Sequence, residues 1–251
     1  MGPDHTSADV AFDRSELFDA YRVERPPAER RPWVVANMVA GLDGSATVGG
    51  RVGVLSGPVD REVFAFIRSL ADVVLVGAST VRTERYGPVR LTDEQRRSRR
   101  AASRPELPTL AVVSLSLEFD WTLPLFTAPD GSRPLLITAA AAGDAAIERS
   151  REHAEVIVAG DGAVDLAQAL AALRQRGATT VLTEGGPTVL GELIAASLVD
   201  ELCLTLAPAM GGDPLPIVVW PAASRPSPRF SLDSVCEASG HLFLRYLVNP
   251  S

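Results

Sequence analysis

The sequence predicts a single α/β domain built on a mixed, mostly parallel sheet. Short apolar runs of strand length alternate along the chain with segments of helical spacing, which is typical of a parallel sheet with helices on both faces. Two further apolar runs close the chain with Ser239-Gly240 between them, and they predict an antiparallel hairpin at one edge of the sheet. The length of 251 residues fits one large domain or two small ones, and no repeat or linker divides the chain, so one domain is the simpler interpretation.

The composition argues against several classes of protein. All 24 cationic residues are arginine, which excludes a lysine Schiff base and the lysine of a P-loop. A net charge of −7 disfavours a nucleic-acid binder. The three histidines and the two cysteines, Cys203 and Cys236, show no metal-binding spacing, and no apolar run reaches the roughly 18 residues of a transmembrane helix. We therefore expect a soluble, cytoplasmic protein without a metal site and without nucleic-acid or membrane partners.

The first residues differ in composition from the rest. Residues 1–31 are polar and contain several prolines, which predicts an N-terminal tail. Within that tail, Leu17, Phe18 and Tyr21 are the positions at which a short helix could dock. The folded domain is expected to span residues 32–251.

Seven apolar runs predict mostly buried strands, because they are short and rich in valine, leucine and isoleucine. They lie at residues 33–39, 73–76, 110–113, 135–138, 156–158, 180–183 and 201–206. The runs near residues 230–236 and 241–248 form the predicted hairpin. Asp43-Gly44, after the first run, is a strong turn signal.

Helix signals fill the gaps between these runs. Ser56-Gly57-Pro58 opens a helix whose apolar residues follow at helical spacing. An alanine-rich helix is expected to end near Glu152, a helix capped by Asp165 is expected to end at Arg176, and another helix is expected to end near Ala196. Residues 84–108 hold many arginines and predict a solvated loop or a short helix.

Two segments repeat one design, in which a buried strand runs into a glycine turn and then into a helix start. These segments are residues 75–80 and 182–188. Ligands of open α/β sheets bind beyond the carboxyl ends of the strands, and a helix N-terminus reached through glycine can hold a phosphate without any cation. Two such turns on one sheet would suit a dinucleotide. Neither turn is a G-x-G-x-x-G fingerprint, so a standard Rossmann dehydrogenase is disfavoured.

Three polar residues near these turns are candidate site residues. Glu184 follows a strand end, where its carboxylate either accepts N–H groups from a pyrimidine or pterin edge or serves only as an acid at a helix start. Asn37 lies inside an apolar run and needs a partner, either a backbone group or a ligand. Asp43, in the Asp-Gly turn, is more often structural.

Taken together, the motifs of residues 33–248 resemble the RibD C-terminal family of riboflavin biosynthesis reductases, which has a dihydrofolate-reductase-like fold. No single motif would suffice, but the series occurs in the order that the family has. The segments that carry the resemblance are residues 37–44 (NMVAGLDG), 71–81, 182–191 and 198–202, with Ala207-Pro208 and Gly211-Gly212 behind them.

The resemblance implies an NADPH-dependent reductase of 5-amino-6-(5-phosphoribosylamino)uracil. The hydride would pass from the nicotinamide to C1′ of the sugar, which turns ribosyl into ribityl. No catalytic side chain is implied, because such an enzyme mainly positions two ligands face to face. Substrate contacts are implied for Glu184, Arg68, Arg90 and Val52. Cofactor contacts are implied for Asn37, Val54, Gly77, Thr80, Glu84, Ser114, Leu115, Gly185, Gly186, Pro187, Thr188, Val189 and Leu190.

The sequence also departs from the family pattern. Ser45 stands where the family usually has a cation, and Glu84-Arg85-Tyr86 replaces an acid-Asn-Pro run. The zinc deaminase motifs that often precede this domain do not occur in the sequence, so a stand-alone reductase is expected. The departures leave open a dihydrofolate or other pterin reductase of the same fold.

Other classes of function also stay open from the residues alone. They are a non-catalytic nucleotide sensor and a nucleic-acid binder that uses residues 96–104. The family's reductases are commonly homodimers, and the apolar final strands could supply such an interface. Thr80, Arg82 and Ser116 are the candidate partners for the 2′-phosphate that distinguishes NADPH from NADH.

Overall fold

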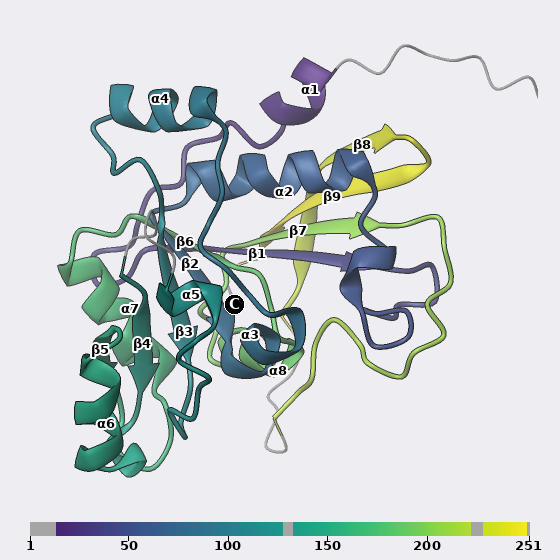
Figure 1. Ribbon diagram of the computed structural model, residues 1–251. Coiled ribbons are helices and arrows are strands. Elements are labelled where there is room, and N and C mark those ends of the chain that lie inside the picture. Colours follow the sequence, from purple (N-terminus) through teal and green to yellow (C-terminus); the bar gives the residue numbers. More distant parts are fainter. Residues whose placement is uncertain (1–13, 128–132, 222–227, 250–251) are drawn as a thin grey trace, which may run out of the picture.

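The computed structural model describes residues 14–127, 133–221 and 228–249. Within these ranges the strands form one nine-stranded sheet of order β5-β4-β3-β2-β6-β1-β7-β9-β8 (Figure 1). All pairs from β5 to β7 are parallel, whereas β9 runs antiparallel to β7 and β8 antiparallel to β9. The strands are β1 (Trp33–Ala40), β2 (Val73–Gly77), β3 (Thr109–Val113), β4 (Leu135–Thr138), β5 (Glu155–Val158), β6 (Thr180–Thr183), β7 (Glu201–Leu206), β8 (Phe230–Ala238) and β9 (His241–Val248).

The expected fold class is confirmed. Each of the seven predicted inner strands forms, and the terminal hairpin turns at Ser239-Gly240 as expected. The central strands β1, β2 and β6 are buried along almost their whole length, as parallel strands covered on both faces must be. In β7, buried and half-buried residues alternate instead, because one face of the sheet is more open near the antiparallel end.

Helices cover both faces of the sheet. They are α1 (Arg14–Asp19), α2 (Pro58–Leu70), α3 (Ala78–Glu84), α4 (Asp93–Ala101), α5 (Pro124–Thr127), α6 (Asp144–Arg151), α7 (Leu166–Gln175) and α8 (Pro187–Ala195), with 3-10 turns η1 (Val52–Val54) and η2 (Ala140–Ala142). α2 lies across one face with α1 and α4 outside it (Figure 1). α7 and α8 pack on the other face, and each face has its own apolar core.

Two helical predictions need adjustment. The alanine-rich helix is divided, because Gly143 has φ of +81° and interrupts it between η2 and α6. The arginine-rich segment forms α4, which is the short-helix alternative, and Thr92 caps it in a capping box with Gln95. On this helix Arg99 is buried, and its guanidinium donates to the carbonyls of Ser69 and Ala71 at the end of α2.

Part of the expected N-terminal tail packs on the domain. The short helix forms as α1, with Leu17 and Tyr21 buried. The chain that follows is tied down by ion pairs from Arg25 to Glu201 and from Arg31 to Asp200. The second half of the polar segment is therefore held by the sheet, while the division into residues 1–31 and 32–251 stays a prediction.

None of the helices in the described ranges is both long and apolar enough to cross a membrane.

Candidate active site

The two glycine turns lie side by side at the carboxyl ends of β2 and β6. The Gly77 N–H donates to the Gly185 carbonyl at 3.0 Å, and the Glu184 N–H donates to the Leu75 carbonyl at 3.1 Å. Gly185 has φ of +109°, a conformation that side chains other than glycine rarely adopt. The helices α3 and α8 therefore begin next to each other, as the repeated sequence design predicts.

Glycine also sets how closely these two helix starts approach. A Cβ built on Gly186 would lie 3.0 Å from the Thr80 hydroxyl oxygen, and one on Gly77 would lie 3.2 Å from a methyl group of Val189. A side chain at either position would therefore be tight against its neighbour, which would have to shift by a few tenths of an ångström.

A cavity of about 300 Å³ opens above the turns, and we call it the glycine-lined cavity. It is lined by nine of the seventeen residues implied by the resemblance. These are Asn37, Val52, Thr80, Glu84, Glu184, Gly185, Gly186, Pro187 and Thr188.

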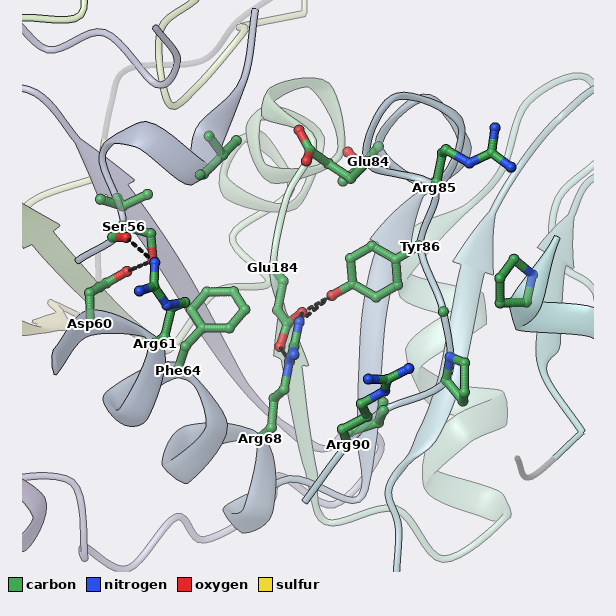
Figure 2. A pocket seen from close by; sticks show the side chains of 18 residues that line it. Ser56, Asp60, Arg61, Phe64, Arg68, Glu84, Arg85, Tyr86, Arg90 and Glu184 are labelled. Carbon is green, nitrogen blue, oxygen red and sulfur yellow. Dashed lines mark hydrogen bonds and ion pairs between the residues drawn. The ribbon is translucent and has the colours of Figure 1, made fainter. Parts of the chain in front are cut away.

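A second cavity, of about 570 Å³, adjoins the first, and we call it the arginine-lined cavity. The residues that it shares with the glycine-lined cavity are Val39, Val52, Phe64, Thr80, Glu84 and Glu184. Its own walls include Arg61 and Arg68 of α2 and Arg85, Tyr86 and Arg90 of the loop after α3 (Figure 2). The substrate residues implied by the resemblance, Glu184, Arg68, Arg90 and Val52, all line this cavity.

The centre of the arginine-lined cavity is a three-residue cluster of Glu184, Arg68 and Tyr86 (Figure 2). Arg68 donates from Nε to Glu184 Oε1 at 2.5 Å and from Nη2 to Oε2 at 2.6 Å. The Tyr86 hydroxyl donates to Oε2 and accepts from Arg68 Nη2 at 2.6 Å. The Glu184 side chain is only 1% exposed, so the arginine and the tyrosine replace water as its partners.

The environment of the cluster fixes its protonation. Burial raises the pKa of Tyr86 well above its usual value, and the negative charge of Glu184 raises it further. Burial alone would lower the pKa of Arg68, but the charge of Glu184 and its hydrogen bonds outweigh this and raise it. The tyrosine therefore keeps its proton and the arginine its charge across the physiological pH range.

Other cations of the cavity are not tied to a carboxylate in this way. Arg90 is exposed at the cavity wall. Arg61 is exposed as well and donates to the Ser56 carbonyl at 2.7 Å, beside the hydrogen bond from the Ser56 hydroxyl to Asp60. Charge for an anionic group is thus available at the rim, away from Glu184.

The remaining implied cofactor residues lie outside the two cavities. Val54 is 65% exposed and Leu115 is 44% exposed, and Ser114 is buried, with its hydroxyl accepting from the Leu117 N–H. The side chains of Val189 and Leu190 point into the core rather than toward a ligand. For these two residues, a role in binding could come only from the backbone at the start of α8.

Sequence reasoning gave no role to Tyr86 and did not mention Phe64. Tyr86 was read only as a departure from the family pattern. Phe64 lies one helical turn before Arg68 on α2, and the Arg68 guanidinium sits over its ring at 4.6 Å. The spacing of four residues on one helix face is the signal that could have linked Phe64 to the site.

Ser45 also differs from its expected setting near the substrate. Its side chain is buried, and its hydroxyl donates to Asp43 at 2.6 Å. The same carboxylate accepts from the backbone of Gly211 and Gly212, which joins two distant loops. Ser45 therefore completes a turn and lines neither cavity.

Comparison with known proteins places this chain in a family. The family model described as the RibD C-terminal domain matches residues 32–242. The chain belongs to the RibD C-terminal domain family. Among curated proteins, the chain is similar to the 2,5-diamino-6-ribosylamino-4(3H)-pyrimidinone 5′-phosphate reductases of Aquifex aeolicus and Archaeoglobus fulgidus. The first is 30% identical over 206 residues (75% of this chain, 83% of the relative), and the second is 28% identical over 190 residues (75% and 86%).

Solved structures agree with the family assignment. A pyrimidine reductase-like protein of Corynebacterium diphtheriae is 31% identical, with a TM-score of 0.80 over 88% of this chain and 93% of that one. The riboflavin biosynthesis reductase of Saccharomyces cerevisiae shares the fold at 16% identity, with a TM-score of 0.67 over 95% of this chain and 100% of that one. The expectation of a pyrimidine reductase of the RibD type, an oxidoreductase, is confirmed.

Proposed function

We propose that this protein reduces the ribosyl group of a ribosylaminopyrimidine 5′-phosphate to a ribityl group with a hydride from NADPH. The observation that carries the proposal is the junction of the two cavities. They meet at Glu184, and they share apolar walls, so two ligands bound in them would meet at that point. The names of the curated relatives support the same class of reaction.

The glycine-lined cavity fits the cofactor. The starts of α3 and α8 offer free N–H groups and partial positive charge to a pyrophosphate, and a Cβ at Gly186 would fill the space against Thr80. Asn37, Thr80 and residues 185–188 would hold the dinucleotide. When bound there, NADPH supplies the hydride.

The arginine-lined cavity fits the substrate. Glu184 faces it with a carboxylate for the N–H groups of the base, and Arg90 offers an exposed guanidinium for the 5′-phosphate. Arg68 donates from both Nε and Nη2 to Glu184, so we assign it the role of holding that carboxylate rather than that of binding phosphate.

The chain promotes the reaction by placing the two ligands. Hydride transfer requires that the donor and acceptor carbons meet in one geometry with water excluded. Val39, Val52 and Phe64 line both cavities and supply apolar surface at their junction. Base and phosphate contacts at the two ends of the substrate would then fix C1′ of the sugar between them.

The first experiment is a test for NADPH oxidation, followed by absorbance, with the ribosylaminopyrimidine phosphate as substrate and dihydrofolate in a parallel reaction. We expect turnover of the sugar phosphate alone. Turnover of dihydrofolate alone would move the function to pterin reduction, and oxidation with neither would refute the proposal. NADH in place of NADPH tests the cofactor choice, and Arg82→Ala is expected to weaken any preference for NADPH.

The phosphate contact can be tested separately. Arg90→Ala should raise KM for the phosphorylated substrate about tenfold and leave the dephosphorylated analogue unaffected, because only the phosphate would lose its charged partner. Arg97→Ala removes an exposed arginine from α4 and is the matched control. Equal effects of Arg90→Ala on both substrates would remove the assignment.

We also propose that two chains associate through the open face of the β7–β9–β8 sheet. Leu232, Val235 and Leu242 of the hairpin are 53%, 53% and 39% exposed, which is costly for a monomer in water. Light scattering after size-exclusion chromatography should give the mass of a dimer, and Val235→Glu should shift it to that of a monomer. A monomeric wild-type protein would refute this proposal. The cytoplasmic location stays a prediction.

A further inference from the structure

A third cavity, of about 760 Å³, lies on the outer side of α2, and we call it the outer cavity. Its walls come from α1 and the chain just after it, from α2, and from α4 with the residues that follow it (Figure 1). Arg61 lines both this cavity and the arginine-lined cavity, so the two adjoin at α2. The function proposed above gives the outer cavity no role.

The walls of the outer cavity carry more positive than negative charge. Four arginines and two glutamates line it, in a chain whose net charge is −7. The arginines are Arg22, Arg61, Arg99 and Arg104, and the glutamates are Glu62 and Glu94. An excess of guanidinium groups around a cavity favours an anionic ligand.

Two of these arginines lie at the C-terminal end of α2. Arg99 donates to three backbone carbonyls, two of them at this helix end, and Arg104 donates to another carbonyl there at 2.7 Å. The carboxylate of Asp72 lies 3.3 Å from Arg104. Arg99 forms no ion pair with a carboxylate within the ranges that the structure describes, so it is held by partial charges only.

Arg99 is therefore a buried cation with an incomplete environment. It is 3% exposed, and its Nη2 atom is buried with no hydrogen-bond partner among the described residues. Burial and the neighbouring positive charge of Arg104 lower the pKa of Arg99 to about 10, so the guanidinium still carries its charge at neutral pH. Since a buried charge is disfavoured unless an opposite charge pairs with it, a negative group at this wall would be stabilised.

We propose that the outer cavity binds a phosphate monoester, with Arg99 and Arg104 as the residues that hold the phosphate group. Neighbouring guanidinium groups bind phosphate oxygens through charge-assisted hydrogen bonds, and a dianion would supply the negative charge that Arg99 lacks. The cavity has more room than inorganic phosphate needs, and Phe18 and Leu70 add apolar wall for an organic group. The proposal is independent of the function proposed above.

A small anion fits these observations better than a nucleic acid does. On the exposed side of α4, Arg96 and Arg100 pair with Glu106, which reduces the positive charge that a nucleic acid could contact. The guanidinium without a counter-charge belongs instead to Arg99, which is buried at the wall of a cavity. A small molecule can enter that space, whereas a folded or extended polynucleotide is confined to the surface.

The test is isothermal titration calorimetry of the full chain with phenyl phosphate, inorganic phosphate and phenol as probes. Arg90→Ala is the background for every titration, because it removes the phosphate contact proposed for the active site. We expect phenyl phosphate to bind more tightly than inorganic phosphate, and phenol not to bind.

Variants of α4 locate the binding site. Ser98→Glu places a carboxylate at the wall of the outer cavity and should weaken phenyl phosphate binding about tenfold through charge repulsion. Arg97→Gln changes the net charge equally at the neighbouring exposed position, outside the cavity, and should leave the Kd unchanged. Arg99→Gln should weaken binding about tenfold or more. Circular dichroism shows whether Arg99→Gln folds, and if it does not, Ser98→Glu decides.

Several results would overturn the proposal. Equal Kd values for Ser98→Glu and Arg97→Gln would place the ligand elsewhere, and no binding of either phosphate probe at millimolar concentration would remove the site. Phenol that binds as tightly as phenyl phosphate would show that charge does not hold the ligand. Inorganic phosphate that binds as tightly as phenyl phosphate would overturn the assignment to a monoester. Binding of a single-stranded oligonucleotide in place of phenyl phosphate would assign the arginines to a nucleic acid.

Discussion

Glu184 and Glu201 form a natural comparison within the sheet. Glu184 directly follows β6 and Glu201 is the first residue of β7, the two strands that flank β1, and their side chains are 1% and 0% exposed. Each carboxylate accepts hydrogen bonds from the Nε and Nη2 atoms of one arginine. This arginine is Arg68 for Glu184 and Arg25 for Glu201. The two ion pairs are thus alike in charge and geometry, and both carboxylates are buried.

The difference lies in the other partners of each carboxylate. Glu201 also accepts from Arg245 at 2.8 Å, from the Trp33 indole at 3.2 Å and from the Cys203 thiol at 3.5 Å, which fills its acceptor positions. Among the described residues, Glu184 gains only the Tyr86 hydroxyl as a further partner, and it faces a cavity. A saturated carboxylate can serve only stability, whereas one with a free position beside a cavity can also serve a ligand.

The largest effect is expected from Glu201→Gln. The variant leaves Arg25 buried without its counter-charge and leaves Arg245 with Asp233 alone, and breaking a buried ion pair costs about 3–5 kcal/mol of unfolding free energy. Urea denaturation measures the loss. The kcat/KM of the folded fraction should not change, and a change in that constant would break the distinction drawn between the two glutamates.

The same pair predicts a pH dependence of stability. Burial raises the pKa of Glu201, but the hydrogen bonds and charges of Arg25 and Arg245 outweigh it, so the pKa is lowered from its ordinary value of 4.5. The stabilisation is therefore present above about pH 4.5 and is lost as the pH falls through the lowered pKa of the folded state. The difference in unfolding free energy between wild type and Glu201→Gln should shrink below that pH.

Other acids do not disturb this measurement. Asp43, Asp120 and Asp213 also have lowered pKa values, caused mainly by hydrogen bonds from neighbouring hydroxyls and backbone N–H groups. They are present in both proteins, so their contributions cancel in the difference. A difference that stays constant down to pH 3 would contradict the assignment to Glu201.

Glu184→Gln should act on catalysis rather than on stability. Losing a charged hydrogen-bond acceptor for the base is expected to lower kcat/KM by about 100-fold, measured by NADPH oxidation. The unfolding free energy should fall by less than in Glu201→Gln, since Arg68 is 21% exposed and can be hydrated. A larger stability loss for Glu184→Gln than for Glu201→Gln would reverse the comparison.

Sequence patterns predicted the fold well because apolar periodicity and turn residues are local. The strands, the hairpin at Ser239-Gly240 and the two adjacent glycine turns all follow from short segments. The RibD-type resemblance added Arg68 and Glu184 to one site, and both line the same cavity.

Sequence patterns could not show how the polar groups divide their hydrogen bonds. Arg68 and Glu184 are 116 residues apart in the sequence. Their hydrogen bonds form only because α2 packs against β6. The hydrogen bond from Tyr86 to Glu184 likewise joins residues that are distant in the sequence. The partners that fill the acceptor positions of Glu201 include Arg25, which lies in the segment before the first strand. These long-range contacts separate Glu184, the carboxylate proposed to bind the substrate, from Glu201, whose partners are all within the protein.

A third carboxylate, Asp165, extends the series to its smallest expected effect. It caps α7 at the surface, and its side chain accepts from the N–H groups of Ala167 and Gln168 at 2.9 and 3.0 Å. Asp165→Ala should cost about 1 kcal/mol, the usual value of an N-cap, because water can replace the lost partner at both N–H groups. Thermal unfolding measures it, with Asp165→Asn as the variant that keeps a cap. The loss of unfolding free energy should therefore grow from Asp165→Ala to Glu201→Gln, as the burial of the carboxylate increases. Of the three sites, only Glu184 should change kcat/KM when it is substituted. A loss of unfolding free energy above about 3 kcal/mol in Asp165→Ala would show that burial does not set this order.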